Sequence, residues 1–587
     1  MRKLGRGVDL QGLAVAIAAG VGAVAGSYAV AGFRPGFVVA PVSAFVTNTA
    51  PAALVAWSIQ TLGELGDSLV LVASFALAVA LFAAVTYGAS TVRTGTRWAA
   101  PALAGVAVAV VAWALTGAVG PSLAAGAVAA LVAGVGLAGT TRVADSEPSG
   151  NAGEGSAVER TSDTAPGSGR RGVLRSIAVA VGAVLVGGVL GRRSTAAALK
   201  RGLSGRRPGS AGGSVAGDGA TPAGATTGGT PADGSSDGSS AAGDAAEGGS
   251  SVDGGSKSGG GSKSGGGSTG ESVVASLLEV AAKRSLDVSG LEGLVSERFY
   301  QVDIAAVDPD VGADGWSLKF TGAVESDREL GYADLVGRPA EHRFVTLRCV
   351  GEHLNGEKMD TALWTGVPLA PLLEEVGAPD TCCVRLRAAD GYFEGFPLSA
   401  LRNAFLAYRM NGEPLPRGHG HPVRVLVPGH WGEINVKWVT EIEVLDQRAT
   451  GYWEKRGWHG TGPVGTVAKL HAVERLGDGR IQVAGHTYAG TRDVERVEVS
   501  VDGGDTWADA TLSERLPGAT AADGRSLRET AEDAWRMWEY RYRAESPHEV
   551  VVRAVDGTGT VQPKEKSNPF PSGPSGWVRR RVDPTNL

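Results

Sequence analysis

The residue types best suited to metal or redox chemistry are few and lie in one half of the chain. There are three cysteines, Cys349, Cys382 and Cys383, and all nine histidines lie between His342 and His548. Three cysteines cannot build a disulfide framework, and neither a paired C-x-x-C zinc pattern nor a C-x-x-C-H heme site occurs. The adjacent cysteines could close only a strained vicinal disulfide, so we expect both to fill a core strand. A single cysteine thiolate, by contrast, is a strong ligand for a soft, high-valent metal.

Cys349 lies within a series of motifs that span about 110 residues. It stands in Phe344-Val-Thr-Leu-Arg-Cys-Val-Gly351. The motifs after it are Asp390-Gly-Tyr, Asn411-Gly-Glu-Pro-Leu-Pro, His419-Gly-His-Pro-Val-Arg424, Val427-Pro-Gly and Asn435-Val-Lys-Trp438. The combination resembles the molybdopterin enzymes of the sulfite oxidase family, in which one cysteine binds molybdenum beside the two dithiolene sulfurs of the pterin. The resemblance implies that Cys349 is the metal ligand, against the alternative of a buried structural cysteine.

The resemblance also implies where the cofactor is held. His419 and Arg424 stand where the family contacts the anionic phosphate of the pterin, a task suited to an imidazole donor and a guanidinium fork. Asn435, Val436 and Lys437 match the family's second cofactor-binding stretch, where backbone amides and an ammonium hold polar pterin and phosphate atoms. The alternative for the first pair is a solvent-facing loop, and we expect the tryptophan after Lys437 to lie in the core.

Two further sets of candidate cofactor residues carry weaker signals. Asp390 matches a family position only loosely, and an Asp-Gly turn is the equal alternative. Phe299, Tyr300 and Gln301 belong to a segment that resembles the family's opening loop. We expect these three to line the cofactor entrance, with simple packing as the alternative.

The arginines with which the family binds dianionic sulfite are missing. Their positions fall at Leu354, at Gln301 or Val302, and at Phe570, while the family's active-site tyrosine falls at Trp458. We expect Trp458 to bound the pocket as a catalytic residue. A hydrogen bond to a charged group contributes ~1.5 to 3 kcal/mol, so the changes favour a sulfoxide or N-oxide over sulfite. Basic residues that offer compensation are His353, His421, Arg456 and His459.

The globular half divides into two expected domains. Residues 271–461 alternate β-rich runs with short helices, which is an α+β pattern, after a helix over Ser272 to Lys283. Residues 462–587 show strands such as Val494 to Val501 and a hairpin signal at Asp502, which predict an Ig-like β-sandwich. This second region resembles the family's dimerisation domain and so implies a homodimer.

Residues 1–195 are predicted to form a transmembrane region. Four uncharged stretches are each long enough to cross a bilayer: Leu13–Gly32, Leu69–Tyr87, Ala99–Val119 and Leu123–Gly139. The apolar segment 37–62 contains Pro41, Pro51, Asn48 and Gln60, so we expect an interfacial or re-entrant piece there. Basic residues before the first stretch place the N-terminus inside.

A fifth apolar segment, residues 170–191, follows the run Gly169-Arg-Arg-Gly-Val-Leu-Arg-Ser176. It resembles a twin-arginine export signal, which carries folded cargo such as a cofactor-loaded enzyme. An ordinary membrane anchor is the alternative. Both place the globular part outside the cytoplasm, although six basic residues from Arg192 to Arg207 favour the opposite orientation.

Composition excludes several partners and cofactors. The membrane half has no histidine or cysteine and only the initiator methionine, so it lacks the usual axial ligands and we expect no heme. Residues 208–270 are rich in glycine and serine and predict a disordered linker. A net charge of −6 argues against a nucleic-acid partner.

These observations favour a membrane-tethered, extracytoplasmic molybdopterin oxidoreductase. It would transfer two electrons and one oxygen atom on a small sulfur or nitrogen compound and exchange electrons with a separate carrier. One alternative is a sulfoxide or N-oxide reductase of the same fold. An alternative of another class is a non-enzymatic surface protein that displays an Ig-like domain.

Overall fold

The computed structural model describes residues 9–51, 64–92, 98–138, 167–203, 266–304, 307–380 and 382–587. Most of the predicted linker lies outside these ranges. Its last residues belong to helix α8 (Gly266–Arg284), which begins before the predicted start at Ser272. The helix is anchored because Val274, Leu277 and Ala281 pack into a hydrophobic core.

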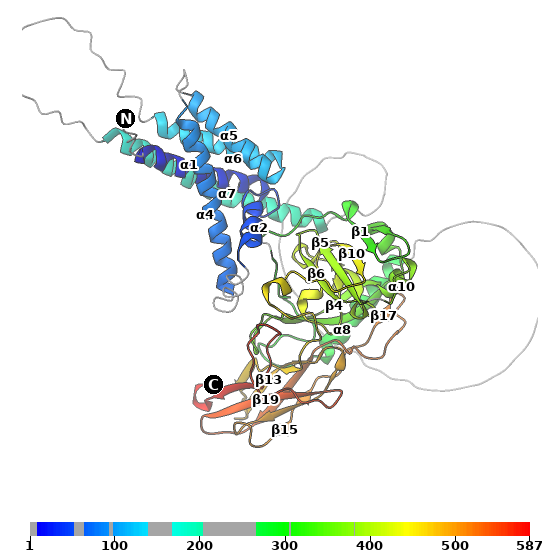
Figure 1. Cartoon of the computed structure of the whole chain (residues 1–587). Coiled ribbons are helices and arrows are strands. Elements are labelled where there is room, and N and C mark those ends of the chain that lie inside the picture. Colours follow the sequence, from blue (N-terminus) through cyan, green and yellow to red (C-terminus); the bar gives the residue numbers. More distant parts are fainter. Residues whose placement is uncertain are drawn as a thin grey trace, which may run out of the picture. The chain divides into compact units, whose positions relative to one another are not determined.

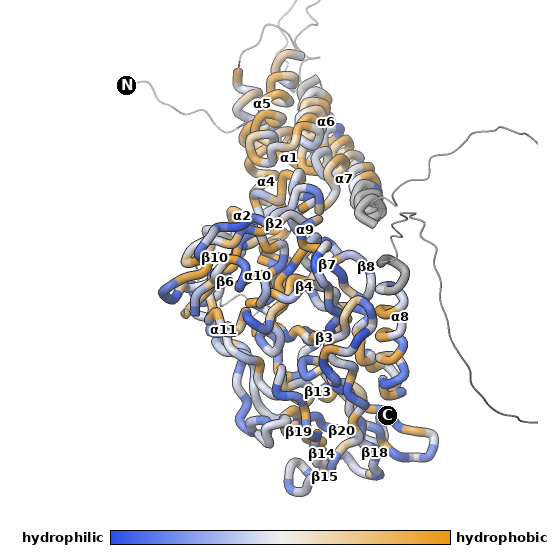
Figure 2. Tube along the Cα trace, turned by 90° about the vertical axis from the view of Figure 1, so that its right-hand side faces the viewer, coloured by the Kyte–Doolittle hydropathy of each residue, from blue (hydrophilic) through white to orange (hydrophobic). Residues whose placement is uncertain are grey.

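The described residues of the N-terminal part include five helices long and apolar enough to cross a bilayer. They are α1 (Leu10–Ala31), α4 (Glu64–Ser90), α5 (Ala99–Thr116), α6 (Val119–Ala138) and α7 (Gly167–Leu203). Figure 2 shows the first four as largely hydrophobic along their length. They match the four predicted stretches and the twin-arginine-like segment. Helix α2 (Val39–Thr49) is too short to span a bilayer, and residues 52–63 lie outside the described part.

The first globular region contains two sheets (Figure 1). One has the order β2-β1-β10-β5-β6, with β1 and β10 parallel and the other pairs antiparallel. Its strands are β1 (Ser317–Gly322), β2 (Arg328–Gly331), β5 (Cys383–Ala388), β6 (Phe393–Pro397) and β10 (Val439–Leu445). The short helices α9 (Tyr332–Val336), α10 (Ala370–Glu375) and α11 (Leu398–Leu401) contribute leucines to its core.

The other sheet has the order β17-β3-β4-β7-β8, and β9 pairs with β7. Its strands are β3 (Glu341–Arg348), β4 (Met359–Pro368), β7 (Phe405–Met410), β8 (Glu413–Pro414), β9 (Arg424–Leu426) and β17 (Thr520–Ala521). Nine of the ten residues of β4 are buried, as expected for a central strand covered on both faces. The mixture of strands and short helices agrees with the predicted α+β pattern.

The second globular region has two antiparallel sheets, ordered β11-β13-β18-β16 and β15-β14-β19-β20, with β12 beside β13. Its strands are β11 (Val467–Ala468), β12 (Ala472–Arg475), β13 (Ile481–Tyr488), β14 (Val494–Ser500), β15 (Ala508–Asp509), β16 (Thr511–Leu512), β18 (Arg536–Tyr542), β19 (His548–Asp556) and β20 (Val578–Val582). Residues of both sheets share one hydrophobic core, for example Val483 and Val552.

The two globular regions are interlocked. Strand β17 follows the predicted boundary at 462, yet Thr520 pairs with His342 and Ala521 with Glu341 of β3. The second region therefore supplies an edge strand to a sheet of the first.

The adjacent cysteines depart from the prediction. Cys382 is exposed, Cys383 is buried at the start of β5, and their sulfurs form a disulfide. Successive residues of a strand point to opposite faces, so both could not enter the same core. The expectation that both fill a core strand is wrong.

Candidate functional site

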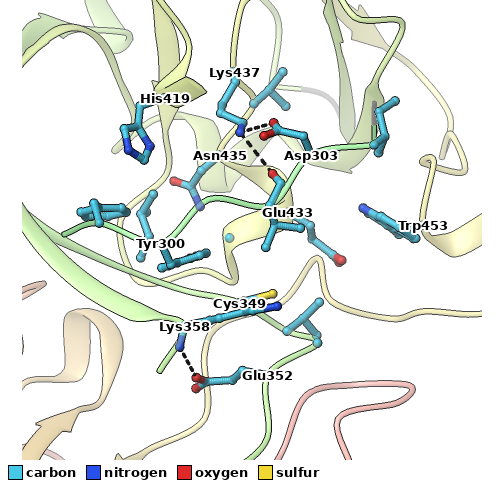
Figure 3. Close-up of a pocket in the computed structure, with 18 of the residues that line it drawn as sticks. Tyr300, Asp303, Cys349, Glu352, Lys358, His419, Glu433, Asn435, Lys437 and Trp453 are labelled. Atoms are coloured by element: carbon cyan, nitrogen blue, oxygen red, sulfur yellow. Dashed lines mark hydrogen bonds and ion pairs between the residues drawn. The ribbon is translucent and has the colours of Figure 1, made fainter. Parts of the chain in front are cut away.

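A cavity of about 580 Å³ lies where the ends of β3, β9 and β10 meet the loops between them. Three stretches of chain supply most of its lining: residues 299–304, the loop 347–358 and residues 419–438. Figure 3 shows Cys349, His419, Asn435 and Lys437 around this space, with Trp453 at another side. The cavity therefore brings together most of the residues that the sequence singled out. Its volume lies in the range of cofactor and ligand sites.

Cys349 follows the last residue of β3 and is partly exposed to the cavity. Its backbone N–H donates to the Lys358 carbonyl at 3.0 Å, which closes the base of the loop between β3 and β4. Burial raises the pKa of the thiol to about 11, although the Gly351 amide and the Lys358 ammonium oppose this shift. Conversion to a thiolate at neutral pH therefore requires an additional positive charge such as a metal ion.

His419, Arg424 and Lys437 form what we call the basic wall of the cavity. Arg424 lies in β9 and donates to the Asn435 carbonyl at 2.8 Å, but its buried Nε has no partner among the described residues. Lys437 pairs with Asp303 and donates to the Gly418 carbonyl at 3.0 Å. The wall therefore offers charged donors that are already oriented by the protein.

A glycine allows the basic wall to close. Gly420 has a φ of 105°, and a Cβ on it would come within 3.0 Å of the Arg424 Cβ and 3.1 Å of the Lys437 Cβ. A side chain at this position would require Arg424 or Lys437 to shift by a few tenths of an ångström, and the backbone conformation is one that glycine adopts readily.

Burial sets the charge of each group in the basic wall. It lowers the pKa of His419 to about 3, helped by Arg424 and Lys437, so the imidazole is neutral. The pKa of Arg424 falls to about 10, and that of Lys437 is also lowered, first by burial and against the attraction of Asp303. Arg424 nevertheless stays protonated at neutral pH.

The second predicted cofactor stretch borders the same cavity, but its side chains have different surroundings. Asn435 uses its amide internally, accepting from the Val427 N–H at 2.7 Å and donating to the Trp431 carbonyl at 3.0 Å. Val436 is buried and lines the cavity. Trp438 is buried as expected, but it also lines the cavity and its indole N–H has no partner among the described groups.

Of the candidate cofactor residues with weaker sequence signals, some line the cavity and one does not. Phe299 and Tyr300 line the cavity, and the Phe299 ring packs edge-on against His419 with centroids 5.5 Å apart. Gln301 is exposed, and its amide donates to Asp303 at 2.7 Å, so its side chain is not part of the lining. Asp390 lines the cavity but also accepts from the Tyr392 N–H at 2.9 Å, which is the alternative turn geometry.

A different set of residues forms what we call the acidic wall: Tyr392, Glu433, Trp453 and Trp458 line the cavity, with Glu394 and Glu454 behind them. The Tyr392 hydroxyl lies 2.9 Å from both a Glu394 carboxylate oxygen and the Glu433 carbonyl. Glu394 and Glu454 both lie against Gly451, where a Cβ would overlap them. Three carboxyl groups are thus gathered beside one cavity.

The acidic wall is deficient in hydrogen-bond partners. Among the described residues, no well-aligned hydrogen bond reaches the buried carboxylate oxygens of Glu433 and Glu454 or the Trp458 indole N–H, although the Gly460 amide lies near Glu433 and the Glu394 carboxyl near Glu454. Burial, with the nearby Glu454 charge, raises the pKa of Glu433 to about 8. The pKa of Glu394 is raised well above its usual range by burial and by Glu454. Glu433 is therefore largely protonated at neutral pH, and the pKa of Glu394 is shifted in the same direction.

The three positions of the missing arginines do not all face the cavity. Val302 lines it, but Leu354 is buried in the hydrophobic core and Phe570 packs edge-on against Trp458 at 5.2 Å. An arginine at position 354 would be buried among apolar side chains. Lys358 lines the cavity instead, and its charge acts on Cys349.

Sequence reasoning missed Lys358, Tyr392, Glu433 and Trp453, and it assigned Trp438 to the core alone. Glu433 stands two residues before the predicted Asn435 stretch, and Tyr392 ends the Asp390-Gly-Tyr motif. Their closeness in sequence to the predicted motifs could therefore have identified Glu433 and Tyr392 as candidate site residues. Lys358 and Trp453 enter the cavity only through the fold of the chain.

Two parts of the chain match known domain families. Residues 304–453 match the oxidoreductase molybdopterin binding domain, and residues 464–569 match the Mo-co oxidoreductase dimerisation domain. The site described above lies mainly within the first match. The second match covers most of the second globular region.

Curated relatives cover the same half of the chain. The sulfite oxidase of Arabidopsis thaliana is 28% identical over 304 residues, which are 42% of this chain and 77% of that protein. The mitochondrial sulfite oxidase of Homo sapiens is 28% identical over 307 residues, 43% of this chain and 54% of that protein. The NADH nitrate reductase of Solanum lycopersicum is 25% identical over 327 residues, 44% of this chain and 35% of that protein. The chain thus spans only about half of the human protein's length.

Proposed function

Because its globular half belongs to the sulfite oxidase family of molybdopterin oxidoreductases, we propose that this protein transfers oxygen atoms and electron pairs on a small, weakly charged sulfur or nitrogen compound. The observation that carries the proposal is the position of Cys349 in one cavity between the basic and acidic walls. The family membership argues against the alternative of a non-enzymatic display protein.

The cavity fits a molybdenum-pterin cofactor. Cys349 offers a sulfur ligand, while Arg424 Nε and Trp438 Nε1 are buried donors that have no acceptor among the described residues. We assign the pterin and its phosphate to Arg424, Lys437 and His419, of which the last stays neutral and donates or accepts one hydrogen bond. When bound, the cofactor supplies the exchange of two electrons and one oxygen atom.

The acidic wall is the basis for the proposed substrate. A dianion such as sulfite would lie near Glu433 and Glu454 with few compensating donors, and removing such an ion from water without partners is costly. A neutral sulfoxide or N-oxide oxygen can accept from the Trp458 indole and from a protonated Glu433. Lys358 provides a single cation near Cys349. The second candidate function is the reductive direction of the same chemistry, a sulfoxide or N-oxide reductase. The protonated acidic wall favours it because the substrate of such an enzyme is uncharged.

The full chain, purified in detergent, allows a direct test. Molybdenum is measured by mass spectrometry and pterin by fluorescence, and turnover is followed in both directions: sulfite oxidation with a one-electron acceptor, and sulfoxide or N-oxide reduction with a one-electron donor. We expect stoichiometric molybdenum and faster turnover of the uncharged compounds. Absence of molybdenum would refute the enzyme, whereas efficient sulfite oxidation at micromolar concentrations would refute only the proposed substrate.

We further propose that the five apolar helices tether the enzyme to a membrane, with the globular part outside the cytoplasm, as a homodimer that exchanges electrons with a separate carrier. The tether rests on helix length and composition, and the dimer on the matched dimerisation domain. Protease added to intact cells should digest the globular part. Replacing Arg170 and Arg171 by lysine should protect it if the segment is a folded-export signal.

A further inference from the structure

The loop that carries Cys349 is held from the second globular region. Glu352 in this loop is 3% exposed, and its carboxylate accepts from Arg348 Nε at 2.7 Å and from Lys469 Nζ at 2.7 Å. Lys469 follows strand β11 and its side chain is fully buried. A carboxylate from the cavity lining is thus neutralised by an ammonium that lies beyond the boundary between the two matched domains.

More hydrogen bonds tie the same loop to the same segment. Lys469 Nζ also donates to the Gly356 carbonyl at 2.8 Å. Asn355 forms a reciprocal pair with Leu470, donating to its carbonyl at 2.9 Å and accepting from its N–H at 2.8 Å. Arg348 donates to the Gly465 carbonyl at 2.9 Å. Residues 465–470 therefore hold the cysteine loop at several points along its length.

Lys469 itself is firmly placed within the second region. Its N–H donates to the His486 carbonyl at 2.8 Å, and its carbonyl accepts from the Trp538 indole at 3.0 Å. Gly485 lies against that carbonyl so closely that a Cβ would overlap it. The ammonium is therefore presented by a rigid backbone of β11 and β13, and a movement of that sheet would be passed to Glu352.

We propose that Lys469 is a positioning residue for Cys349: the region matched as a dimerisation domain fixes the place of the reactive sulfur through Glu352 and Gly356. The inference deepens the proposed function and rests on it only in taking Cys349 as the reactive residue. Glu352 and Gly356 line the cavity, whereas Lys469 is not among the lining residues and acts through these two.

The test compares Lys469→Met, Lys469→Arg and Glu352→Gln with the unaltered full chain in detergent. Arg553→Met is the matched control, because it removes a 2.6 Å ion pair with Glu498 from the other sheet of the same region. The first readout is alkylation of Cys349 by iodoacetamide in cofactor-free protein, followed by mass spectrometry of its peptide well below the unfolding midpoint. The second is the split between kcat and KM of the loaded enzyme.

We expect Lys469→Met to raise the alkylation rate of Cys349 about tenfold, because the loop opens locally without global unfolding. Lys469→Arg should restore part of the protection, and Glu352→Gln combined with Lys469→Met should add little to either change alone. In the loaded enzyme, kcat should fall about tenfold with KM nearly unchanged, since a misplaced reacting group affects the chemical step.

A lower unfolding midpoint with an unaltered alkylation rate in both Lys469→Met and Glu352→Gln would overturn the inference, since that pattern is also expected of Arg553→Met. If Lys469→Met does not fold, the alkylation rate of Glu352→Gln tests the inference instead. This variant keeps the side-chain volume and one hydrogen-bond acceptor of Glu352. The alkylation result stands even if the loaded enzyme proves inactive on every sulfur or nitrogen compound, so the two proposals fail separately.

Discussion

The two walls of the cavity differ in the charge of their side chains and in how far those side chains are hydrogen-bonded. In the basic wall, Lys437 and Arg424 are largely engaged by Asp303 and backbone carbonyls. In the acidic wall, no well-aligned hydrogen bond from the described residues reaches the buried carboxylate oxygens of Glu433 and Glu454. We propose that the basic wall holds the anionic group of the cofactor. In the acidic wall the Glu433 carboxyl is largely protonated at neutral pH, and we propose that a weakly charged substrate binds there.

The difference is the basis for our proposal that one wall binds the cofactor permanently and the other binds the substrate transiently. Charge-assisted hydrogen bonds to an anionic cofactor are strong and need cations that are held in place. A weakly charged substrate needs the reverse, because fixed charge would bind either the wrong compound or too tightly. The following predictions test this division.

Cys349 lies between the walls, so its loss should have the largest effect. We expect Cys349→Ser to lower turnover by about a thousandfold or more, because a hydroxyl is a far weaker ligand for a soft, high-valent metal. Bound pterin, held by the basic wall, should remain. Turnover and pterin are measured on the same purified protein. Cys382→Ala is the control, and equal turnover in Cys349→Ser and unaltered protein would end the molybdenum assignment.

Weakening the basic wall should release the cofactor. We expect Arg424→Met to lower the pterin content of the purified protein about tenfold, since removing a residue that supports a bound group commonly costs this much affinity. Pterin fluorescence after oxidation measures the content. Arg456→Met is a matched control, because Arg456 stacks on Tyr452 and does not line the cavity. An unchanged pterin content in Arg424→Met would show that the phosphate lies elsewhere.

The acidic wall should make stability depend on pH. The pKa of Glu433 is raised from its ordinary value of 4.5 to about 8 in the folded protein. The protonated carboxyl therefore stabilises the folded state, and this contribution is complete below about pH 4.5. This contribution is lost as pH rises through about 8. Between pH 5 and pH 9 we expect the unfolding midpoint of the cofactor-free protein to fall about 5 °C further than that of Glu433→Gln. Tryptophan fluorescence on heating measures both, and parallel pH profiles would contradict a protonated wall.

The smallest effect concerns substrate choice. Trp458→Tyr places a phenol near the acidic wall, where it can donate a hydrogen bond to an anionic oxygen. We expect the ratio of kcat/KM for sulfite to that for a sulfoxide to rise about two- to threefold. Assays of both compounds on the same preparation measure the ratio. A fall in this ratio would mean that the indole N–H itself binds the anion.

The basic wall could be predicted from the sequence and the acidic wall could not. His419, Arg424 and Lys437 lie in short motifs that resemble the cofactor-binding stretches of the family, so the resemblance alone singled them out. Glu433, Glu394 and Glu454 come from three separate elements, and each alone looks like an ordinary surface glutamate. Only the fold brings the three carboxyl groups together and buries them.

Some helices and strands could be predicted from the sequence, and others could not. The apolar stretches of the N-terminal half and strands such as β14 and β19 were predictable, because their periodicity is local. The position of Leu354 was not, since alignment to a family arginine placed it in the pocket while hydrophobic packing places it in the core. Strand β17 was also missed, because two residues with no periodic pattern gain their structure only by pairing with β3.

The pairing of β17 with β3 has a consequence for synthesis on the ribosome. The sheet that supports Cys349 lacks its edge strand until residue 521 has left the ribosome, and the cysteine loop lacks its ammonium until residue 469 has done so. Domains otherwise tend to fold in order as they emerge. We therefore expect the sheet and the cysteine loop of this region to be completed, and a cofactor to be loaded, only after nearly the whole polypeptide has been made. A stalled or truncated product ending near residue 461 would leave the ribosome with an incomplete sheet and an unsecured thiol.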